Sequence, residues 1–289
     1  MKRFLWTVEL SIITLITLPF LFLPLSSGRV LGLILYYLWR KRRDIAIENV
    51  RMACASGIIR GEPEKIVRKN FEEIGKSVAE MVRIFFGRGK GIISKVRFRG
   101  LENLEKARDK GRGIIFITGH CGNWELLGIA TSSRINPLSV VARKLNNPYL
   151  NSLVEKIRSR YGNNVIYKKG ALKEIIRVLR NNGSVGILMD QAVLPQEGVL
   201  VEFLGRPAWT TKMPVLIAKK TGSPILPAFI KNEGKEQVIT IYPEVMLLSN
   251  NSDSMIEENM RILNSFIENY IKENPEQWLW MHRRWKRTG

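Results

Sequence analysis

Apolar and amphipathic segments alternate over most of the chain. Short apolar runs of strand length recur at 113–118, 138–142, 164–167, 184–189 and 225–230. Segments whose apolar positions repeat with a helical period lie between them, at 101–110, 124–133, 148–161 and 171–180. Strands that alternate with helices form mostly parallel sheets covered on both faces. The pattern predicts an α/β fold, a mostly parallel sheet flanked by helices, with 238–241 as an edge strand and 256–271 as a long helix.

The N-terminal end is more apolar than the rest of the chain. One apolar stretch runs from Phe4 to Leu25 and a second from Val30 to Trp39, and four cations follow. Counted from Phe4, the first stretch is long enough to span a membrane as a helix, whereas the second is too short. Positive charge at both ends favours a hairpin that enters one leaflet from the cytoplasmic face, and a single crossing also fits. We predict an N-terminal hydrophobic helical membrane anchor, with membrane contacts at Trp6, Trp39, Arg40, Lys41, Arg42 and Arg43.

Other interpretations of this apolar end are weaker. A buried helix of a soluble core is the main alternative. A cleaved signal peptide fits poorly, because no small-residue cleavage site follows and the cations at 40–43 would resist translocation. Further along, the stretch 87–91 (GRGKG) marks a joint. The predicted organisation is an anchor over 1–43, a helical segment that packs on the core over 44–91, and an α/β domain over 92–289.

The charge balance implies an anionic partner. The 289 residues include 46 Lys and Arg against 26 Asp and Glu, which gives a net charge of +20. Nucleic acid, an anionic membrane, and phosphorylated or acidic substrates all suit such an excess, and the apolar end favours the membrane. The chain has two cysteines, Cys54 and Cys121, and neither lies in a cluster of metal ligands. A disulfide scaffold and a structural zinc site are therefore not expected.

The segment that follows the strand 113–118 carries the main candidate chemistry. It contains His120, Asn123 and Glu125, with glycines at 119 and 122 that permit a sharp turn. In open α/β sheets, ligands bind beyond the carboxyl ends of the strands, and Asn123 is suited to cap the next helix. We expect Glu125 to hydrogen-bond one nitrogen of His120 and orient the imidazole. The other nitrogen would then accept a proton from an acceptor hydroxyl.

Alternatives to this pair stay open on the residues alone. His120 can be a structural residue beside the helix start, with Glu125 complementing the helix dipole. A nucleophile at Cys121 is a weaker alternative, because neighbours along an extended chain point apart. Metal binding would need more ligands than the segment offers. Asp190 and Gln191 also follow a strand, so we expect them at the same edge of the sheet.

The C-terminal tail interleaves aromatic and cationic residues. Three tryptophans stand among four cations, at Trp278, Trp280, Trp285, Arg283, Arg284, Lys286 and Arg287. Such a pattern can stack on single-stranded nucleic acid or lie in a lipid headgroup layer, and it can also pack the tail onto the domain. The apolar N-terminus favours the headgroup layer over nucleic acid.

These features belong to a longer resemblance. The segment 120–125 (HCGNWE) resembles the His-x4-Asp/Glu signature of the lysophospholipid acyltransferase superfamily, and its wording is similar to the lipid A biosynthesis branch, the lauroyl/myristoyl acyltransferases. The signature alone is weak evidence. Similar blocks follow one another along almost the whole chain, at 42–53, 70–81, 141–162, 189–191, 198–211 and 275–286. In this order they are strong evidence.

The resemblance implies an acyltransferase on the cytoplasmic face of the bacterial inner membrane. It would move a fatty acyl chain from a thioester on acyl carrier protein or coenzyme A to a hydroxyl of a lipid A precursor or related anionic glycolipid. His120 would be the general base and Glu125 would orient it. Arg143 matches an arginine thought to hold an acceptor phosphate or sugar. The expected substrate-binding residues are Asn123, Arg143, Arg158, Asp190 and Gln191.

The resemblance also sets what is not expected. No cofactor is implied beyond the thioester co-substrate, and neither a metal nor nucleic acid is an expected partner. Acceptor identity transfers poorly within the superfamily, so another lipid, such as a glycerolipid or a phosphatidylinositol mannoside, stays open as the acceptor. A basic membrane- or RNA-binding protein without catalytic activity is the alternative from a different class.

Overall fold

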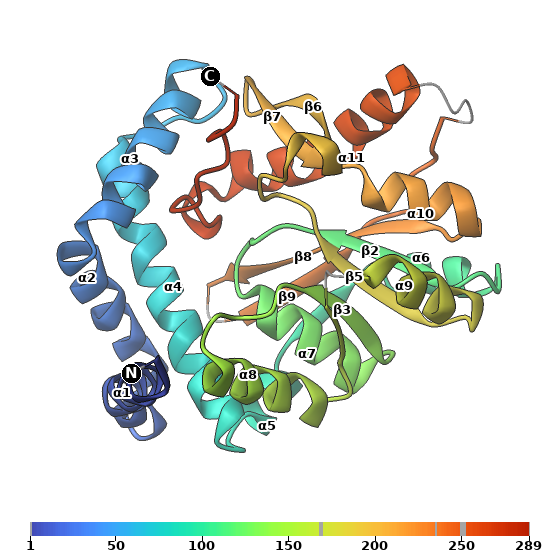
Figure 1. Ribbon diagram of the computed structural model, residues 1–289. Coiled ribbons are helices and arrows are strands. Elements are labelled where there is room, and N and C mark those ends of the chain that lie inside the picture. Colours follow the sequence, from blue (N-terminus) through green and yellow to red (C-terminus); the bar gives the residue numbers. More distant parts are fainter. Residues whose placement is uncertain (1, 168–169, 235, 249–252, 289) are drawn as a thin grey trace.

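The computed structural model describes residues 2–167, 170–234, 236–248 and 253–288. The sheet strands are β1 (Arg97–Arg99), β2 (Ile114–Thr118), β3 (Leu138–Ala142), β4 (Asn164–Tyr167), β5 (Ser184–Leu188), β8 (Ile225–Glu233) and β9 (Glu236–Ile241). They form one sheet in the order β1-β9-β8-β2-β5-β3-β4 (Figure 1). β8 and β9 are antiparallel, and the other neighbouring pairs of this sheet are parallel. The predicted mostly parallel sheet is confirmed.

Helices cover both faces of the sheet. They are α1 (Lys2–Thr17), α2 (Gly28–Leu38), α3 (Arg40–Ala55), α4 (Pro63–Phe85), α5 (Lys90–Ser94), α6 (Leu101–Arg108), α7 (Trp124–Arg134), α8 (Pro148–Arg160), α9 (Ala171–Arg180), α10 (Met213–Thr221) and α11 (Asp253–Glu273). One buried cluster joins α9, α10 and α11 to the sheet, and another joins α5, α6 and α7 to it. The long helix expected over 256–271 corresponds to α11.

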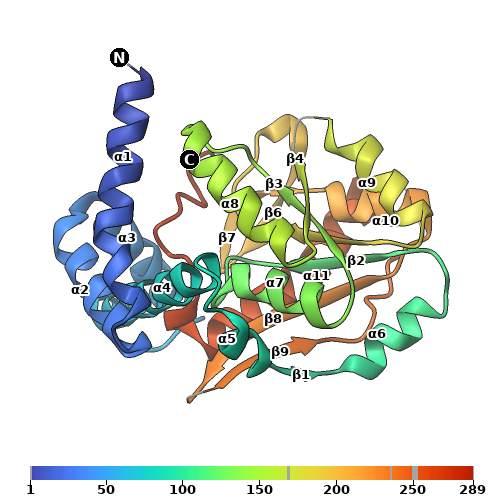
Figure 2. The ribbon, with the colours of Figure 1, turned by 90° about the horizontal axis from the view of Figure 1, so that it is seen from below.

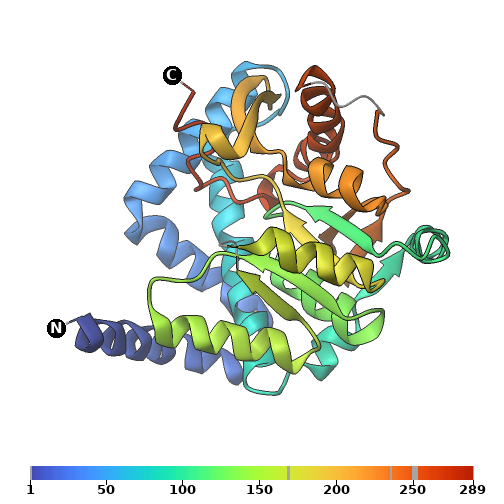
Figure 3. The same ribbon diagram turned by 45° about the vertical axis from the view of Figure 1, so that its right-hand side comes forward.

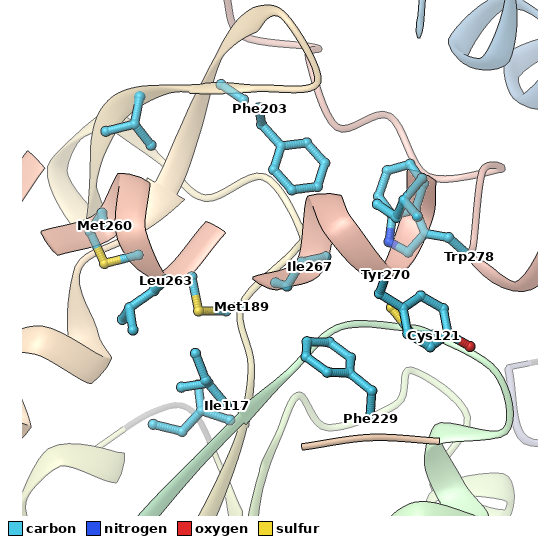
Figure 4. Close-up of a cluster of buried hydrophobic side chains, with 14 of the residues drawn as sticks. Ile117, Cys121, Met189, Phe203, Phe229, Met260, Leu263, Ile267, Tyr270 and Trp278 are labelled. Atoms are coloured by element: carbon cyan, nitrogen blue, oxygen red, sulfur yellow. The ribbon is translucent and has the colours of Figure 1, made fainter. Parts of the chain in front are cut away.

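The alternation of side chains along β2 separates these two layers. Ile117 packs with Met260 and Leu263 of α11 (Figure 4), whereas Phe116 belongs to the cluster with Leu126 of α7. Successive side chains of a strand point to opposite faces, so all five residues of β2 are buried in a sheet that is covered on both sides. The carboxyl end of β2 therefore emerges between two packed layers.

Two β features differ from simple alternation. The expected edge position of 238–241 is wrong, because β9 lies between β8 and the short strand β1. β1 is a three-residue strand, too short to give a strong pattern.

The strands β6 (Gly198–Phe203) and β7 (Arg206–Thr211) form a separate antiparallel hairpin. Leu204 and Gly205 at its tip both have positive φ, at 50° and 75°, which suits a two-residue hairpin turn.

The apolar N-terminal segment packs on α4 through glycines. A Cβ added at Gly32 would lie 2.1 Å from the carbonyl oxygen of Phe71, and one at Gly75 would lie 2.1 Å from that of Gly28. The backbones of α2 and α4 therefore touch, as in close helix pairs built on small residues. By length and composition the stretch Arg3–Leu21 is able to cross a membrane, and 6% of its apolar window is buried. Much of this apolar surface is thus left uncovered by the protein.

The C-terminal tail packs inside the protein. Trp278, Trp280 and Trp285 are 1%, 0% and 8% exposed. Arg284 is fully buried, where it donates hydrogen bonds to the Trp209 carbonyl oxygen (2.6 Å) and to the hydroxyl of Thr210. The expectation that the tail tryptophans lie in a headgroup layer is therefore wrong, and the structural alternative holds. The sequence pattern of aromatic residues interleaved with cations is the same whether the rings face lipid or a protein core.

Candidate active site

A helix cap and a glycine with positive φ determine the turn between β2 and α7. The side-chain oxygen of Asn123 accepts a hydrogen bond from the backbone N–H of Leu126 at 3.1 Å, so the predicted N-cap is confirmed. Gly122 has φ of +56°, and a Cβ there would lie 2.3 Å from the carbonyl oxygen of Ile230. Both its conformation and its close contact require glycine. The turn holds His120 directly beyond the carboxyl end of β2.

The imidazole of His120 is bound by a buried carboxylate. Its Nδ1 lies 2.8 Å from Oδ1 of Asp190, which is 2% exposed. The other oxygen, Oδ2, accepts hydrogen bonds from the backbone N–H of His120 at 2.8 Å and from the indole N–H of Trp278 at 2.7 Å. Burial alone would raise the pKa of Asp190, but the charge and hydrogen bonds of His120, together with the Trp278 indole, outweigh it and lower that pKa to about 2. Asp190 is ionised at neutral pH.

This arrangement sets the roles of the two ring nitrogens. An ionised Asp190 only accepts, so Nδ1 of His120 donates to it, and in the neutral imidazole Nε2 is then the acceptor. The side-chain amide nitrogen of Gln191 lies 3.2 Å from Nε2 and is suited to donate to it. The ring of Trp124 packs beside the imidazole, with centroids 5.1 Å apart. The nitrogen that faces away from Asp190 is therefore a base with an available lone pair.

Glu125 does not hold the position expected for it. Instead of contacting His120, its carboxylate accepts two hydrogen bonds from Arg158, at 3.0 Å from Nε and 2.5 Å from Nη2. Although burial opposes the charged form, the hydrogen bonds and charge of Glu125 raise the pKa of Arg158. The prediction that Glu125 orients the imidazole is thus wrong for this geometry, and Asp190 occupies that position. Glu125 lies in the first turn of α7, from which its side chain reaches α8.

The C-terminal tail is hydrogen-bonded to the turn that holds His120. The backbone N–H of Gly122 donates to the carbonyl oxygen of Gln277 at 2.6 Å, and the N–H of Leu279 donates to the carbonyl oxygen of His120 at 3.0 Å. The side-chain amide of Asn70 on α4 donates to the carbonyl oxygen of Trp278 at 2.7 Å. Sequence reasoning missed this role. The block 275–286 signalled that the tail mattered, but nothing in it indicated pairing with the turn.

A buried acid on α4 supports the other end of the turn. Glu80 is 3% exposed. Its carboxylate accepts hydrogen bonds from the side-chain amides of Asn123 at 2.8 Å and Gln237 at 3.1 Å. Asn123, expected to contact substrate, is itself 3% exposed and is occupied in capping and in this network. Glu80 sits on a helix whose sequence predicts only packing.

A cavity of about 390 Å³ opens at this turn. Its wall includes His120, Glu125, Arg143, Arg158 and Gln191. The structure thus brings together five of the predicted site residues, while Asp190 and Asn123 lie behind them. The lining residues not yet named include the apolar Val140, Val154, Val165, Ile187 and Met213 and the polar Asn151, Glu155 and Tyr167.

The cavity has a cationic rim. Arg143 is exposed after β3. Burial and the charges of Arg287, Arg143 and Arg283 lower the pKa of Lys286 in the C-terminal tail. Cys121 is 1% exposed, and burial together with the Asp190 charge raises the pKa of its thiol well above the usual value. A protonated, buried thiol is unsuited to nucleophilic attack.

The predicted membrane contacts lie on α1, at the junction of α2 and α3, and in the first turn of α3. The carbonyl oxygen of Trp6 and the carboxylate of Glu9 accept hydrogen bonds from the side-chain amide of Asn147, at 3.0 and 2.9 Å. Asn147 caps α8, so α1 lies along the helix that forms one wall of the cavity (Figures 2 and 3). Trp39, Arg40 and Lys41 are exposed, while Arg42 and Arg43 are half-buried. Contact of these residues with lipid stays a prediction.

Metal ligands are not gathered at the site. Across the described ranges, no group of three or more His, Cys, Asp or Glu side chains is placed to hold a metal ion. The cavity wall carries the imidazole of His120, the paired side chains of Glu125 and Arg158, and the amide of Gln191.

Comparisons with known proteins show which family the chain belongs to. A family model described as bacterial lipid A biosynthesis acyltransferase matches residues 2–287. A lipid A biosynthesis acyltransferase of Haemophilus influenzae is 24% identical over 96% of this chain and 86% of its own length. A lipid A biosynthesis lauroyltransferase of Escherichia coli is 27% identical over 90% of this chain and 84% of its own. A phosphatidylinositol mannoside acyltransferase of Mycobacterium tuberculosis is 26% identical over 64% of this chain and 58% of its own.

The matched residues include the apolar N-terminal helices, the turn that holds His120 and the C-terminal tail that packs against this turn. A non-catalytic binding protein is therefore no longer an alternative. The chain belongs to the bacterial lipid A biosynthesis acyltransferase family, and the protein is an acyltransferase.

Proposed function

We propose that this protein is a membrane-associated O-acyltransferase that moves a fatty acyl chain from an acyl thioester to a hydroxyl of a lipid A precursor or a related anionic glycolipid. The observation that carries the proposal is the His120 imidazole, held at Nδ1 by the ionised Asp190 and directed by Nε2 toward the cavity. The family match over residues 2–287 supports the reaction class.

The reaction proceeds by direct transfer. Nε2 of His120 takes the proton of the acceptor hydroxyl as the oxygen attacks the thioester carbonyl carbon. The tetrahedral intermediate collapses, the carbon–sulfur bond breaks, and the leaving thiolate recovers the proton from the imidazolium. Asp190 stays ionised throughout and stabilises the imidazolium, which is the task of a buried carboxylate partner. Gln191 donates to Nε2 in the free enzyme, so the acceptor hydroxyl replaces it.

Arginines on the cavity wall bind the acceptor. The carboxylate of Glu125 holds the guanidinium of Arg158 by two hydrogen bonds, and Arg143 also lines the cavity. The planar guanidinium group suits phosphate because it donates two parallel hydrogen bonds. A phosphorylated or otherwise anionic glycolipid is the acceptor class that these charges favour.

The membrane supplies that acceptor. α1, α2 and the segment between them carry exposed apolar side chains, among them Phe4, Leu15, Phe22 and Leu38, which are 70%, 74%, 73% and 77% exposed. α1 lies along α8, at the wall of the cavity. We assign α1 and α2 to the cytoplasmic face of the inner membrane, with the cavity opening toward lipid. The donor is an acyl thioester on acyl carrier protein or coenzyme A, and no cofactor takes part.

The test is acyl transfer by the purified protein in detergent. Radiolabelled acyl thioester on either carrier is offered with a panel of lipid A precursors, phosphatidylinositol mannosides and glycerolipids, and the products are separated by chromatography. A labelled lipid A precursor is the expected product. A labelled phosphatidylinositol mannoside would favour the acceptor named for the relative from Mycobacterium tuberculosis. Absence of transfer from both carriers to every lipid, in a folded preparation, would overturn the proposal.

A further inference from the structure

Three blocks of the sequence meet next to the turn that holds His120. They are 42–53 on α3, 70–81 on α4, and 275–286 in the C-terminal tail. α4 packs against the apolar helix α2 through Gly75 and is hydrogen-bonded to the tail through Asn70 (Figure 1). The contacts of these blocks therefore connect the apolar N-terminal end of the chain with the active site.

Two buried asparagines bind the tail through its backbone. Four alternate carbonyl groups of the tail accept hydrogen bonds from them, those of Glu276, Trp278, Trp280 and His282. Asn70 on α4 donates to the first two, at 2.8 and 2.7 Å, and Asn49 on α3 donates to the last two, at 2.7 and 2.9 Å. A primary amide has two N–H groups, so each asparagine uses its whole donor capacity on the tail.

The stretch of tail held in this way is the one that contacts the site. Gln277 and Leu279 make the two hydrogen bonds to the turn, at 2.6 and 3.0 Å. Trp278, which lies between them, donates its indole N–H to Asp190 at 2.7 Å. A carbonyl group bound by an asparagine precedes and follows both Gln277 and Leu279. The asparagines thus hold from one side the stretch that supports His120 and Asp190 from the other.

The surroundings of Asn70 are not those that stability alone would favour. Its Oδ1 is buried and has no hydrogen-bond partner among the described residues. An unpartnered buried acceptor costs free energy. What the amide supplies at this cost is its pair of donors, which an apolar side chain of the same shape lacks. Local rules are broken in this way mainly at functional sites.

We propose that Asn49 and Asn70 are positioning residues of the active site. By holding the tail against the turn, they keep Nδ1 of His120 on Asp190 and leave Nε2 directed toward the cavity. Because α4 also packs against α2, the helices next to the apolar N-terminal segment fix the orientation of the base. The inference rests on the proposed function, because it takes His120 to be the general base.

The test observes the imidazole directly. The chain contains two histidines, His120 and His282. Full-length protein in detergent, isotope-labelled at histidine nitrogen alone, therefore gives NMR signals from two imidazoles, and His120→Ala identifies those of His120. The nitrogen shifts report which ring nitrogen carries the proton. They are recorded for the wild type, Asn70→Leu and Asn49→Leu, because leucine is close to asparagine in shape but donates nothing. On the same samples, kcat and KM for the acceptor are measured by acyl transfer.

Asn259→Leu is the matched control. Asn259 on α11 is also buried, and its side-chain amide binds the backbone N–H and carbonyl oxygen of Leu248, at 2.8 and 3.3 Å. Neither residue is among those that line the catalytic cavity. Thermal melting gives the stability that each variant loses. Asn70→Ser, which keeps one donor, is the milder change that keeps the test valid if the leucine variants do not fold.

For Asn70→Leu we expect kcat to fall roughly tenfold, because small displacements of catalytic groups are costly, and the Nδ1 signal of His120 to move toward that of free histidine. KM for the acceptor should change less than kcat. Asn49→Leu should act in the same direction by less, since the carbonyl groups it binds lie beyond Trp278. Asn259→Leu should lose stability without either change.

Unchanged His120 signals in folded variants of Asn70 and Asn49 would overturn this inference alone. An equal loss of kcat in Asn259→Leu would also overturn it, because the asparagines would then act only through the stability of the fold. A wild type that shows a proton on Nδ1 of His120 but transfers no acyl group would overturn the proposed function, while the shifts of the variants would still decide whether the asparagines position the imidazole.

Discussion

The two carboxylates of the site lie in opposite surroundings. Asp190 is 2% exposed, and its oxygens accept hydrogen bonds from the imidazole, from a backbone N–H and from the indole of Trp278. Glu125 is 27% exposed on the cavity wall and is bound by Arg158. One side of the site is therefore a packed layer that fixes the base, and the other is an open wall that meets substrate. We therefore expect substitutions on the packed side to lower kcat, and substitutions on the open wall to act mainly on KM for the acceptor, with smaller losses.

The largest expected effect is that of His120→Ala. Without the imidazole, no group of the packed side is placed to take the acceptor proton, so kcat/KM should fall by about 10²- to 10⁴-fold. Acyl transfer measured with radiolabelled thioester checks this. The ring is partly exposed, so melting and circular dichroism should stay close to the wild type. Turnover within a few-fold of the wild type would show that His120 is not the general base.

Asp190→Asn should come next, with a loss of about 10²-fold in kcat. The amide is close in shape, but it carries no charge to stabilise the imidazolium and does not enforce a proton on Nδ1. The expected loss is in kcat rather than KM, because Asp190 lies behind the imidazole and does not line the cavity. A change confined to KM would contradict its assignment to the packed side.

The same carboxylate should make stability depend on acid pH. Its pKa is about 2 in the folded protein, against an ordinary value of 3.8. A lowered pKa means that the stabilisation is fully present above about pH 4 and is lost as the pH falls toward 2. The shift is worth about 2 kcal/mol. Urea unfolding across this range should show a steeper acid loss for the wild type than for Asp190→Asn. Equal slopes would mean that Asp190 is not the group that titrates.

The pairing of His120 with Asp190 also shows what the sequence could and could not indicate. Both residues were expected at the carboxyl ends of strands, and this follows from local pattern. Their contact depends on β2 and β5 being parallel neighbours, with Thr118 opposite Leu188. Strand order is a property of the whole sheet, so the nearer carboxylate in sequence, Glu125, was assigned the role that Asp190 fills.

The remaining errors have a similar cause. Trp278 reaches Asp190 from a tail 88 residues further along the chain, and Glu80 reaches Asn123 from a helix 43 residues before it. From its residue type, Trp278 could equally be a lipid-facing aromatic, and Glu80 could equally be a solvated acid. Only tertiary packing shows that both are buried partners of the site. The local predictions that needed no such packing, such as the Asn123 cap and α11, agree with the structure.

The open wall can be probed by a double-mutant cycle on Glu125 and Arg158. Each single variant, Glu125→Gln and Arg158→Met, should lower kcat/KM by about tenfold, because breaking a partly buried pair leaves one group without its partner. The double variant should be no worse than the worse single, since neighbours in one pair are not additive. The loss should appear mainly in KM for the acceptor.

Arg158→Lys is the control for this cycle. Lysine keeps the charge but lacks the planar fork that bonds both oxygens of Glu125. We expect it to recover part of the acceptor affinity. If the two single losses simply multiply in the double variant, Glu125 and Arg158 act separately and the paired wall is the wrong description.

The smallest effect expected on turnover is that of Trp278→Phe. Phenylalanine retains most of the ring packing but removes the indole N–H that donates to Asp190 at 2.7 Å. Asp190 keeps its bonds from His120, so kcat should fall only several-fold. Trp280→Phe is the matched control, because it removes an indole hydrogen bond of similar length, 2.6 Å, that goes to the carbonyl oxygen of Pro275 instead. Both tryptophans are buried, so both variants should lose stability by about 1–2 kcal/mol. A kcat loss in Trp278→Phe without one in Trp280→Phe would show that the tail acts on the base through Asp190, whereas equal losses would mean that the tail contributes to turnover only by holding the fold.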